Sequence, residues 1–196
     1  MFSPGPAYMY YYDEEDLQQI ELPCRHWVCR SQLDKWLLDG VDSCPVSSDC
    51  VLKKGTVLIA AILKNDTPAI EEWFDTHPAN FDELVEMCDL DGNSIIMMAV
   101  QGAHESTVEV LLEQLVKYFG KGSIAPLLVM ANNAADKPLM AAAEKNDLVK
   151  AEYLMRAGLA ASTELARALA IVCEEYGADH AITQSWQAMI AKYRLS

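Results

Sequence analysis

Basic residues are scarce in this chain of 196 residues, which has 15 Lys and Arg against 29 Asp and Glu. The formal net charge of −14 would repel the phosphates of nucleic acids and of anionic membranes, so we expect neither as a partner. No apolar run approaches the length of a membrane span, and residues 1–6 lack the basic and apolar regions of a signal peptide. These absences predict a soluble, cytoplasmic protein.

Cysteine is sparse outside one short segment. Of the six cysteines, Cys88 and Cys173 stand alone, and the other four crowd into residues 24–50. A secreted protein held together by disulfides would spread its cysteines more evenly over a shorter chain. We therefore expect a reducing compartment, in which clustered thiols are available to bind a metal or to pack in a small core.

The cluster contains a compact Cys-x-His-x-x-Cys motif, followed by an expected short helix over residues 31–38 and then by Cys-Pro. Zinc favours Cys and His ligands at such close spacing. The segment resembles the RING and U-box domains of ubiquitin ligases. The residues that carry this resemblance are Cys24, His26, Cys29, Trp36, Cys44 and Pro45.

The RING resemblance implies two interleaved zinc sites, which this sequence matches only in part. The positions that match the ligand pairs are, in chain order, Met9, Tyr12, Cys24, His26, Cys29, Gln32, Cys44 and Ser47. One site keeps a single ligand, and the other keeps three, to which Cys50 could add a fourth. One zinc ion on Cys24, His26, Cys44 and Cys50 would resemble the single-zinc RING of SUMO ligases. A module without metal, held by hydrogen bonds and packing, would resemble a U-box.

The same resemblance implies catalysis without a nucleophile, in which the module binds a ubiquitin-charged conjugating enzyme and holds its thioester ready for attack. The residues that match the enzyme-binding groove are Tyr10, Tyr11, Trp36 and Pro45. The chain departs from many active ligases in one respect, because Ser48 or Val51 stands where an Arg or Lys contacts ubiquitin. The strength of activation, or the modifier used, therefore remains open.

From residue 53 onward, the sequence repeats a pattern of helix pairs. Apolar openings at residues 55–61, 92–99 and 136–142 are each followed by an amphipathic helix, and a fourth pair is expected at residues 163–175 and 179–193. The turns within two pairs share the sequence Lys-Asn-Asp. Their aspartates, Asp66 and Asp147, are placed to cap the second helices.

This array resembles ankyrin repeats. The family's Thr-Pro-Leu-His-x-Ala motif is matched at Thr, Leu and Ala by residues 56–61, and at Pro, Leu and Ala by residues 137–142. The spacing between repeats is irregular, with extra residues at 76–87 and 116–133. The alternative to an ankyrin-like array is a generic helical bundle. We thus expect a mainly α protein with a flexible start (1–8), a RING/U-box-like α+β module (9–52) and three or four ankyrin-like repeats (53–196).

Together, the two resemblances imply a ubiquitin ligase whose module recruits the conjugating enzyme and whose array recruits a substrate protein. Turn tips and first helices of such arrays bind proteins, which gives as candidate substrate contacts Lys54, Asp91, Asn93, Asp136 and Lys137. The alternatives are a SUMO-type ligase and a non-catalytic interaction protein in which the module caps the first repeat. A short ligase of this kind also suits an effector that an intracellular bacterium secretes into the host cytosol.

Overall fold

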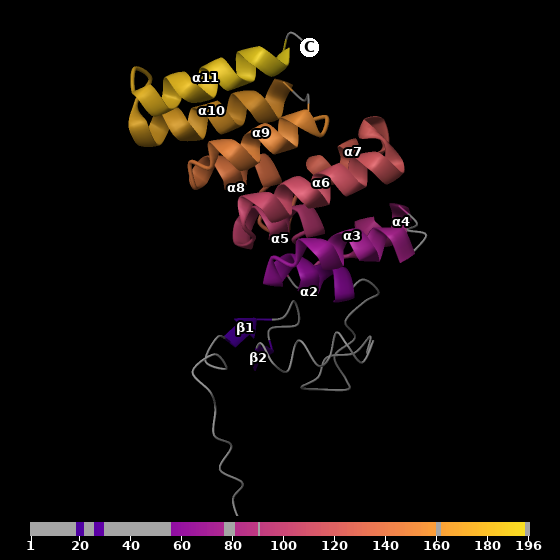
Figure 1. Ribbon diagram of the computed structural model, residues 1–196. Helices are drawn as coiled ribbons and strands as arrows, with labels where there is room; N and C mark the ends of the chain where they lie inside the picture. Colours follow the sequence, from indigo (N-terminus) through magenta and orange to yellow (C-terminus); the bar gives the residue numbers. More distant parts are fainter. Residues whose placement is uncertain are drawn as a thin grey trace, which may run out of the picture.

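The computed structural model describes residues 19–21, 26–29, 56–76, 81–89, 91–159 and 162–194, which are mainly helical, as expected (Figure 1). The helices are α2 (Thr56–Lys64), α3 (Thr67–Thr76), α4 (Phe81–Glu86), α5 (Ile95–Gly102), α6 (Glu105–Phe119), α7 (Lys121–Leu128), α8 (Pro138–Glu144), α9 (Leu148–Arg156), α10 (Ser162–Tyr176) and α11 (Ala181–Arg194). Two short strands, β1 (Gln19–Glu21) and β2 (Trp27–Cys29), precede them. No helix in these ranges is long and apolar enough to cross a membrane.

The helices of this part of the chain form four stacked pairs, which follow one another in sequence order in Figure 1. The pairs are α2 with α3, α5 with α6, α8 with α9, and α10 with α11. Along one layer α2 contacts α5, α5 contacts α8, and α8 contacts α10. Along the other, α3 contacts α6, α6 contacts α9, and α9 contacts α11. The helical architecture is therefore a linear array in which helix pairs chiefly contact their neighbours.

One continuous core runs through the stack from Leu58 to Ile190. The first helices of the two central pairs are almost wholly inside it, since residues 95–100 of α5 and 138–143 of α8 are all buried. Three of the six buried positions in α8 are alanines, which let neighbouring helices approach closely. Packing of each helix pair against its neighbours therefore stabilises the array, because a single pair could not bury its own apolar faces.

Side-chain caps fix where the second helices begin. Asp66 Oδ1 accepts a hydrogen bond from the backbone N–H of Ala69 at 3.2 Å, and Asp147 Oδ1 accepts one from Lys150 at 3.0 Å. Both caps confirm the prediction from the repeated Lys-Asn-Asp turns. Each cap satisfies one of the backbone donors that the first turn of a helix leaves without an intrahelical partner.

The asparagines of these same turns tie one pair to the next. Asn65 and Asn146 adopt left-handed backbone conformations, with φ of 59° and 51°. Asn65 Oδ1 accepts hydrogen bonds from the backbone N–H of His104 and from the Thr107 hydroxyl at the start of α6. Asn146 Oδ1 accepts a 3.0 Å bond from Nε1 of the buried Trp186 in α11. Each asparagine therefore adopts the backbone conformation that its turn requires and accepts hydrogen bonds from the next helix pair.

The irregular spacing of the repeats has a structural cause. The two stretches of excess length, residues 76–87 and 116–133, contain the additional helices α4 and α7. Both helices contribute to the core, since Leu84 of α4 and Ile124, Leu127 and Leu128 of α7 are buried. The two insertions follow successive second helices, and the Phe81 ring lies edge-on against that of Phe119 with centroids 5.7 Å apart. They are packed elements that widen one side of the array.

Candidate binding sites

The turn that precedes α5 is closed by the carboxylate of Asp89. Its Oδ1 accepts hydrogen bonds from the backbone N–H groups of Asp91 at 2.9 Å and Asn93 at 2.8 Å, and its Oδ2 accepts one from Asn93 Nδ2 at 2.8 Å. The Asp-Leu-Asp-Gly-Asn sequence here could be read as a calcium loop. In this geometry the first carboxylate accepts three hydrogen bonds from its own turn, which fits a structural turn.

The turn that precedes α8 repeats this arrangement and stacks directly on the first. Asn132 Oδ1 accepts from the backbone of Ala134 at 3.0 Å and of Asp136 at 2.9 Å. Its Nδ2 donates across to Asn93 Oδ1 at 2.9 Å, and the Asn133 N–H donates to the Asp91 carbonyl at 2.8 Å. We call these two linked turns, residues 89–93 and 132–136, the turn ladder.

Glycine is required where the two turns meet. Gly92 has φ of +76°, and a Cβ built there would lie 2.6 Å from Asn133 Oδ1 and 3.1 Å from the Asn133 backbone nitrogen. A side chain would therefore suffer both an unfavourable backbone conformation and a clash with the next turn. The absence of a side chain at Gly92 thus allows these two turns to pack closely.

The turn ladder brings together most of the candidate substrate contacts, but gives them different roles. Asp91 is exposed at the tip and Asp136 is half-buried. Asn93 is only 7% exposed, and its amide is engaged by Asp89 and Asn132. Its position therefore suits holding the ladder better than contacting a substrate. Lys54 lies outside the described residues.

Lys137 links the ladder to the last helix pair. Its Nζ lies 2.5 Å from Glu164 Oε1, and the two side chains are 29% and 13% exposed. The hydrogen bond from Lys137, followed by one from Thr163, lowers the pKa of the Glu164 carboxyl below its ordinary value. Lys137, immediately before α8, is thus paired with Glu164 of α10.

The N-terminal strands form an antiparallel pair, in which Gln19 faces Cys29, Ile20 faces Val28 and Glu21 faces Trp27. Residues 22–26 connect the two strands, so Cys24 and His26 fall within that connection in the sequence. Val28 is 1% exposed and His26 is half-buried.

The remaining candidates of the cysteine-rich segment lie outside the described residues, as does the helix expected at residues 31–38. These candidates are Tyr10, Tyr11, Cys24, Trp36, Cys44, Pro45 and Cys50. Within the described ranges, no group of three or more His, Cys, Asp or Glu side chains is arranged to hold a metal ion. Of the four proposed zinc ligands, those ranges contain only His26.

Comparisons with known proteins found no matching family model, no similar curated protein and no similar solved structure.

Proposed function

We propose that this protein is a ubiquitin ligase that acts by positioning. In this proposal, the module of residues 9–52 binds a charged conjugating enzyme, and the helical array holds the substrate protein. Its main support is the antiparallel pairing of β1 with β2 around the segment that carries Cys24 and His26. A hairpin holds the ends of that segment close together, which suits a small module whose ligands come from residues adjacent in sequence.

The chemistry would belong to the conjugating enzyme and the substrate. A substrate lysine amine attacks the thioester carbonyl, an isopeptide bond forms, and the thiol of the conjugating enzyme leaves. The ligase contributes by raising the effective concentration of the two reactants in a productive orientation. We assign the contact with the conjugating enzyme to Tyr10, Tyr11, Trp36 and Pro45, because large apolar side chains suit a shallow protein-binding groove.

A single zinc ion suits the available donors. Cys24, Cys44 and Cys50 would supply three thiolates and His26 an imidazole nitrogen, a set that matches tetrahedral zinc. Bound there, zinc would supply a structural crosslink within the module. The alternative is a module without metal, in which packing around residues such as Val28 has this role.

Substrate binding is assigned to the edge formed by the turn ladder. Asp91 and Asp136 lie on turns joined by the Asn132–Asn93 and Asn133–Asp91 hydrogen bonds, so their positions relative to one another are fixed. An edge that carries two aspartates at fixed positions favours a basic segment of a substrate, and the net charge of −14 would favour its approach.

The decisive experiment is auto-ubiquitination with a panel of charged conjugating enzymes. The full chain is compared with Trp36→Ala and Pro45→Ala, and Val149→Ala is the control because Val149 is 39% exposed on α9. We expect transfer by the full chain and by the control, and loss in the two groove variants with unchanged thermal unfolding. Absence of transfer with every conjugating enzyme, from folded protein, would contradict the ligase proposal.

A second function is favoured by one observation, which is that the array has a continuous core of its own from Leu58 to Ile190. Such an array could act as a non-catalytic protein-binding scaffold, with the module as a cap on its first pair. The Trp36→Ala variant separates the two functions. A cap would lose stability on this substitution, whereas a ligase would lose ubiquitin transfer while its melting temperature stayed the same.

A further inference from the structure

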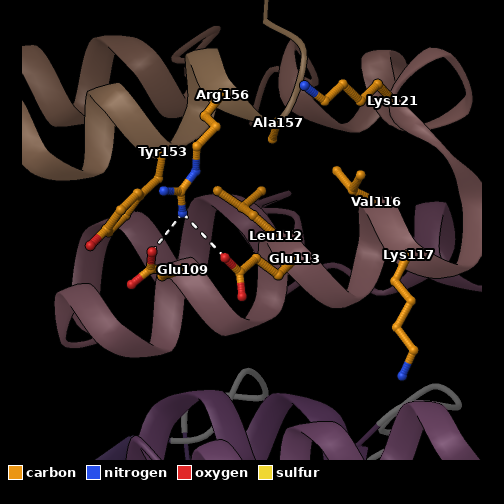
Figure 2. A pocket seen from close by; sticks show the side chains of 9 residues that line it. All are labelled: Glu109, Leu112, Glu113, Val116, Lys117, Lys121, Tyr153, Arg156 and Ala157. Atoms are coloured by element: carbon orange, nitrogen blue, oxygen red, sulfur yellow. Dashed lines mark hydrogen bonds and ion pairs between the residues drawn. The ribbon is translucent and has the colours of Figure 1, made fainter.

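A groove opens between the second helices α6 and α9, on elements other than the turn ladder. It encloses about 250 Å³ and is lined by residues of α6, of the start of α7 and of the end of α9 (Figure 2). Its lining residues are Glu109, Leu112, Glu113, Val116, Lys117, Lys121, Tyr153, Arg156 and Ala157.

The floor of the groove is apolar. Leu112 and Ala157 are 3% and 5% exposed, so they form its base, and the half-buried Val116 forms part of its side. Pockets for drug-sized ligands enclose about 300–1,000 Å³. A groove of about 250 Å³ with an apolar base therefore suits one or two side chains of a protein better than a metabolite or cofactor.

Arg156 and the side chains that it contacts form one end of the groove. Its Nη2 lies 2.6 Å from Glu109 Oε1 and 3.3 Å from Glu113 Oε1, and its Cζ lies 4.9 Å from the centre of the Tyr153 ring. The hydrogen bond from Arg156 lowers the pKa of the Glu109 carboxyl, so this carboxylate stays charged to lower pH than usual. Arg156 is thus already neutralised, and two carboxylates for one guanidinium leave this end acidic.

The other end is basic and is built by the inserted helix α7. Lys121, the first residue of α7, is exposed, and within the described residues it makes no ion pair. A Cβ at Gly158 would lie 3.3 Å from Lys121 Cβ, so this end of α7 packs closely against the end of α9. Figure 2 shows the Lys121 side chain extending toward Ala157. The neighbouring Lys117 is paired with Asp75 at 3.4 Å, whereas Lys121 has no such ion-pair partner among the described residues.

We propose that this groove binds a short segment of a partner protein that presents one bulky apolar side chain beside one aspartate or glutamate. The apolar side chain packs on Leu112, Val116 and Ala157, and the adjacent carboxylate pairs with Lys121. The acidic end at Glu109 and Glu113 repels a second carboxylate on the opposite side of the anchor, which gives the segment a direction. This partner is independent of the substrate assigned to the turn ladder.

The test uses the full chain and a display library of random seven-residue peptides. We expect selected peptides to share a bulky apolar residue next to a single Asp or Glu. The best peptide is then synthesised and titrated by fluorescence anisotropy against Val116→Asp, Lys121→Glu and the matched control Lys145→Glu. Lys145 is exposed and precedes α9, at the end opposite Arg156.

Charge reversal at Lys121 should weaken binding about fivefold or more, because an attraction becomes a repulsion. The Val116→Asp variant should lose binding, and Lys145→Glu should bind like the parent chain. A peptide with Lys in place of its acidic residue should recover binding to Lys121→Glu, which a merely structural role of Lys121 would not produce.

Several results would overturn the proposal. These are the selection of no peptides, of basic peptides, or of peptides that bind equally to the parent, Val116→Asp and Lys121→Glu. Competition by a synthetic peptide of residues 8–16, which follows tyrosines with acidic residues, would assign the groove to this chain's own N-terminal segment and not to a partner.

Discussion

At the scale of single residues, a few backbone positions with positive φ determine how the repeats join. Asn65, Gly92 and Asn146 all have φ between 51° and 76°. The two asparagines lie in turns within a pair and bond to the next pair, and Gly92 lies in the turn that packs against the following one. Left-handed conformations are unfavourable for most residues, so Gly and Asn at these positions are a direct consequence of the turn geometry. The side chains of the asparagines then add hydrogen bonds that a glycine could not make.

Replacing Gly92 by alanine should destabilise the array by about 1–3 kcal/mol, because the added Cβ meets Asn133 at 2.6 Å in a left-handed conformation. The matched control is Gly102→Ala at the end of α5, where a Cβ meets nothing within 4 Å. That substitution should be neutral or stabilise by up to about 1 kcal/mol. Urea unfolding followed by circular dichroism measures both, and equal effects would contradict the packing argument.

Asn146 contributes to stability in two ways, by its hydrogen bond with Trp186 and by its tolerance of a left-handed backbone conformation, and two substitutions separate them. Asn146→Ala removes the acceptor of the buried Trp186 Nε1 and places alanine at φ of 51°, so we expect a loss of about 2–4 kcal/mol. Asn146→Gly removes only the acceptor and should cost less, about 1–3 kcal/mol. Trp186 fluorescence during urea unfolding reports this contact, although the other tryptophans require a Trp186→Phe reference. Equal losses in the two variants would mean that backbone strain contributes nothing.

At the scale of secondary-structure elements, the sequence predicted what depends on local pattern. The openings at residues 55–61, 92–99 and 136–142, the fourth pair, and the caps Asp66 and Asp147 all correspond to observed features. These predictions succeed because helical periodicity and capping are properties of adjacent residues. Helices α4 and α7 were not predicted, since a short helix adds too few turns to show a clear period.

Features that depend on contacts between repeats could be predicted only in part. The repeated turns predicted the caps, but the bonds from Asn65 to α6 and from Asn146 to α11 join residues about forty positions apart, beyond the reach of local patterns. Asn93 was predicted as a surface contact because it lies at a turn tip, whereas Asp89 and Asn132 engage it inside the ladder. The groove between α6 and α9 likewise exists only once the two helices are packed.

The Lys137–Glu164 pair between α8 and α10 should make stability depend on pH. Because the folded-state pKa of Glu164 is lowered, the pair stabilises the fold above the ordinary pKa of about 4.5, and this contribution is lost as the pH falls through the folded-state value. Lys137→Met should therefore lower the free energy of unfolding by about 1–2 kcal/mol at pH 7 and by less at pH 3. Urea titrations at both values measure the difference.

The control for this prediction is Lys192→Met, which removes the ion pair with Glu152. Those side chains are 63% and 41% exposed, so solvent screening leaves an expected effect of a few tenths of a kcal/mol at most. A Lys137→Met variant with the same loss of stability at pH 3 and pH 7 would show that lost packing, and not the charge pair, explains its effect.

At the scale of the whole molecule, successive helix pairs stabilise one another by packing along a line. The last described helix, α11, covers apolar side chains at one end of this core. In α11, Trp186, Met189 and Ile190 face inward and are buried, while Gln184, Ser185, Gln187 and Lys192 are exposed. A buried apolar face and an exposed polar face are the distribution expected of a capping helix.

Removal of α11 by ending the chain at residue 176 tests this role. The truncation exposes the apolar surface that Trp186, Met189 and Ile190 cover and removes the bond to Asn146, so the loss should propagate into α9 and α10. We expect a lower melting temperature by circular dichroism and concentration-dependent association by light scattering. The control, Gln187→Glu on the exposed face of α11, should show the association state and the melting temperature of the parent chain. A truncated chain that associates no more than the parent and melts at the same temperature would show that α11 does not stabilise the rest of the array.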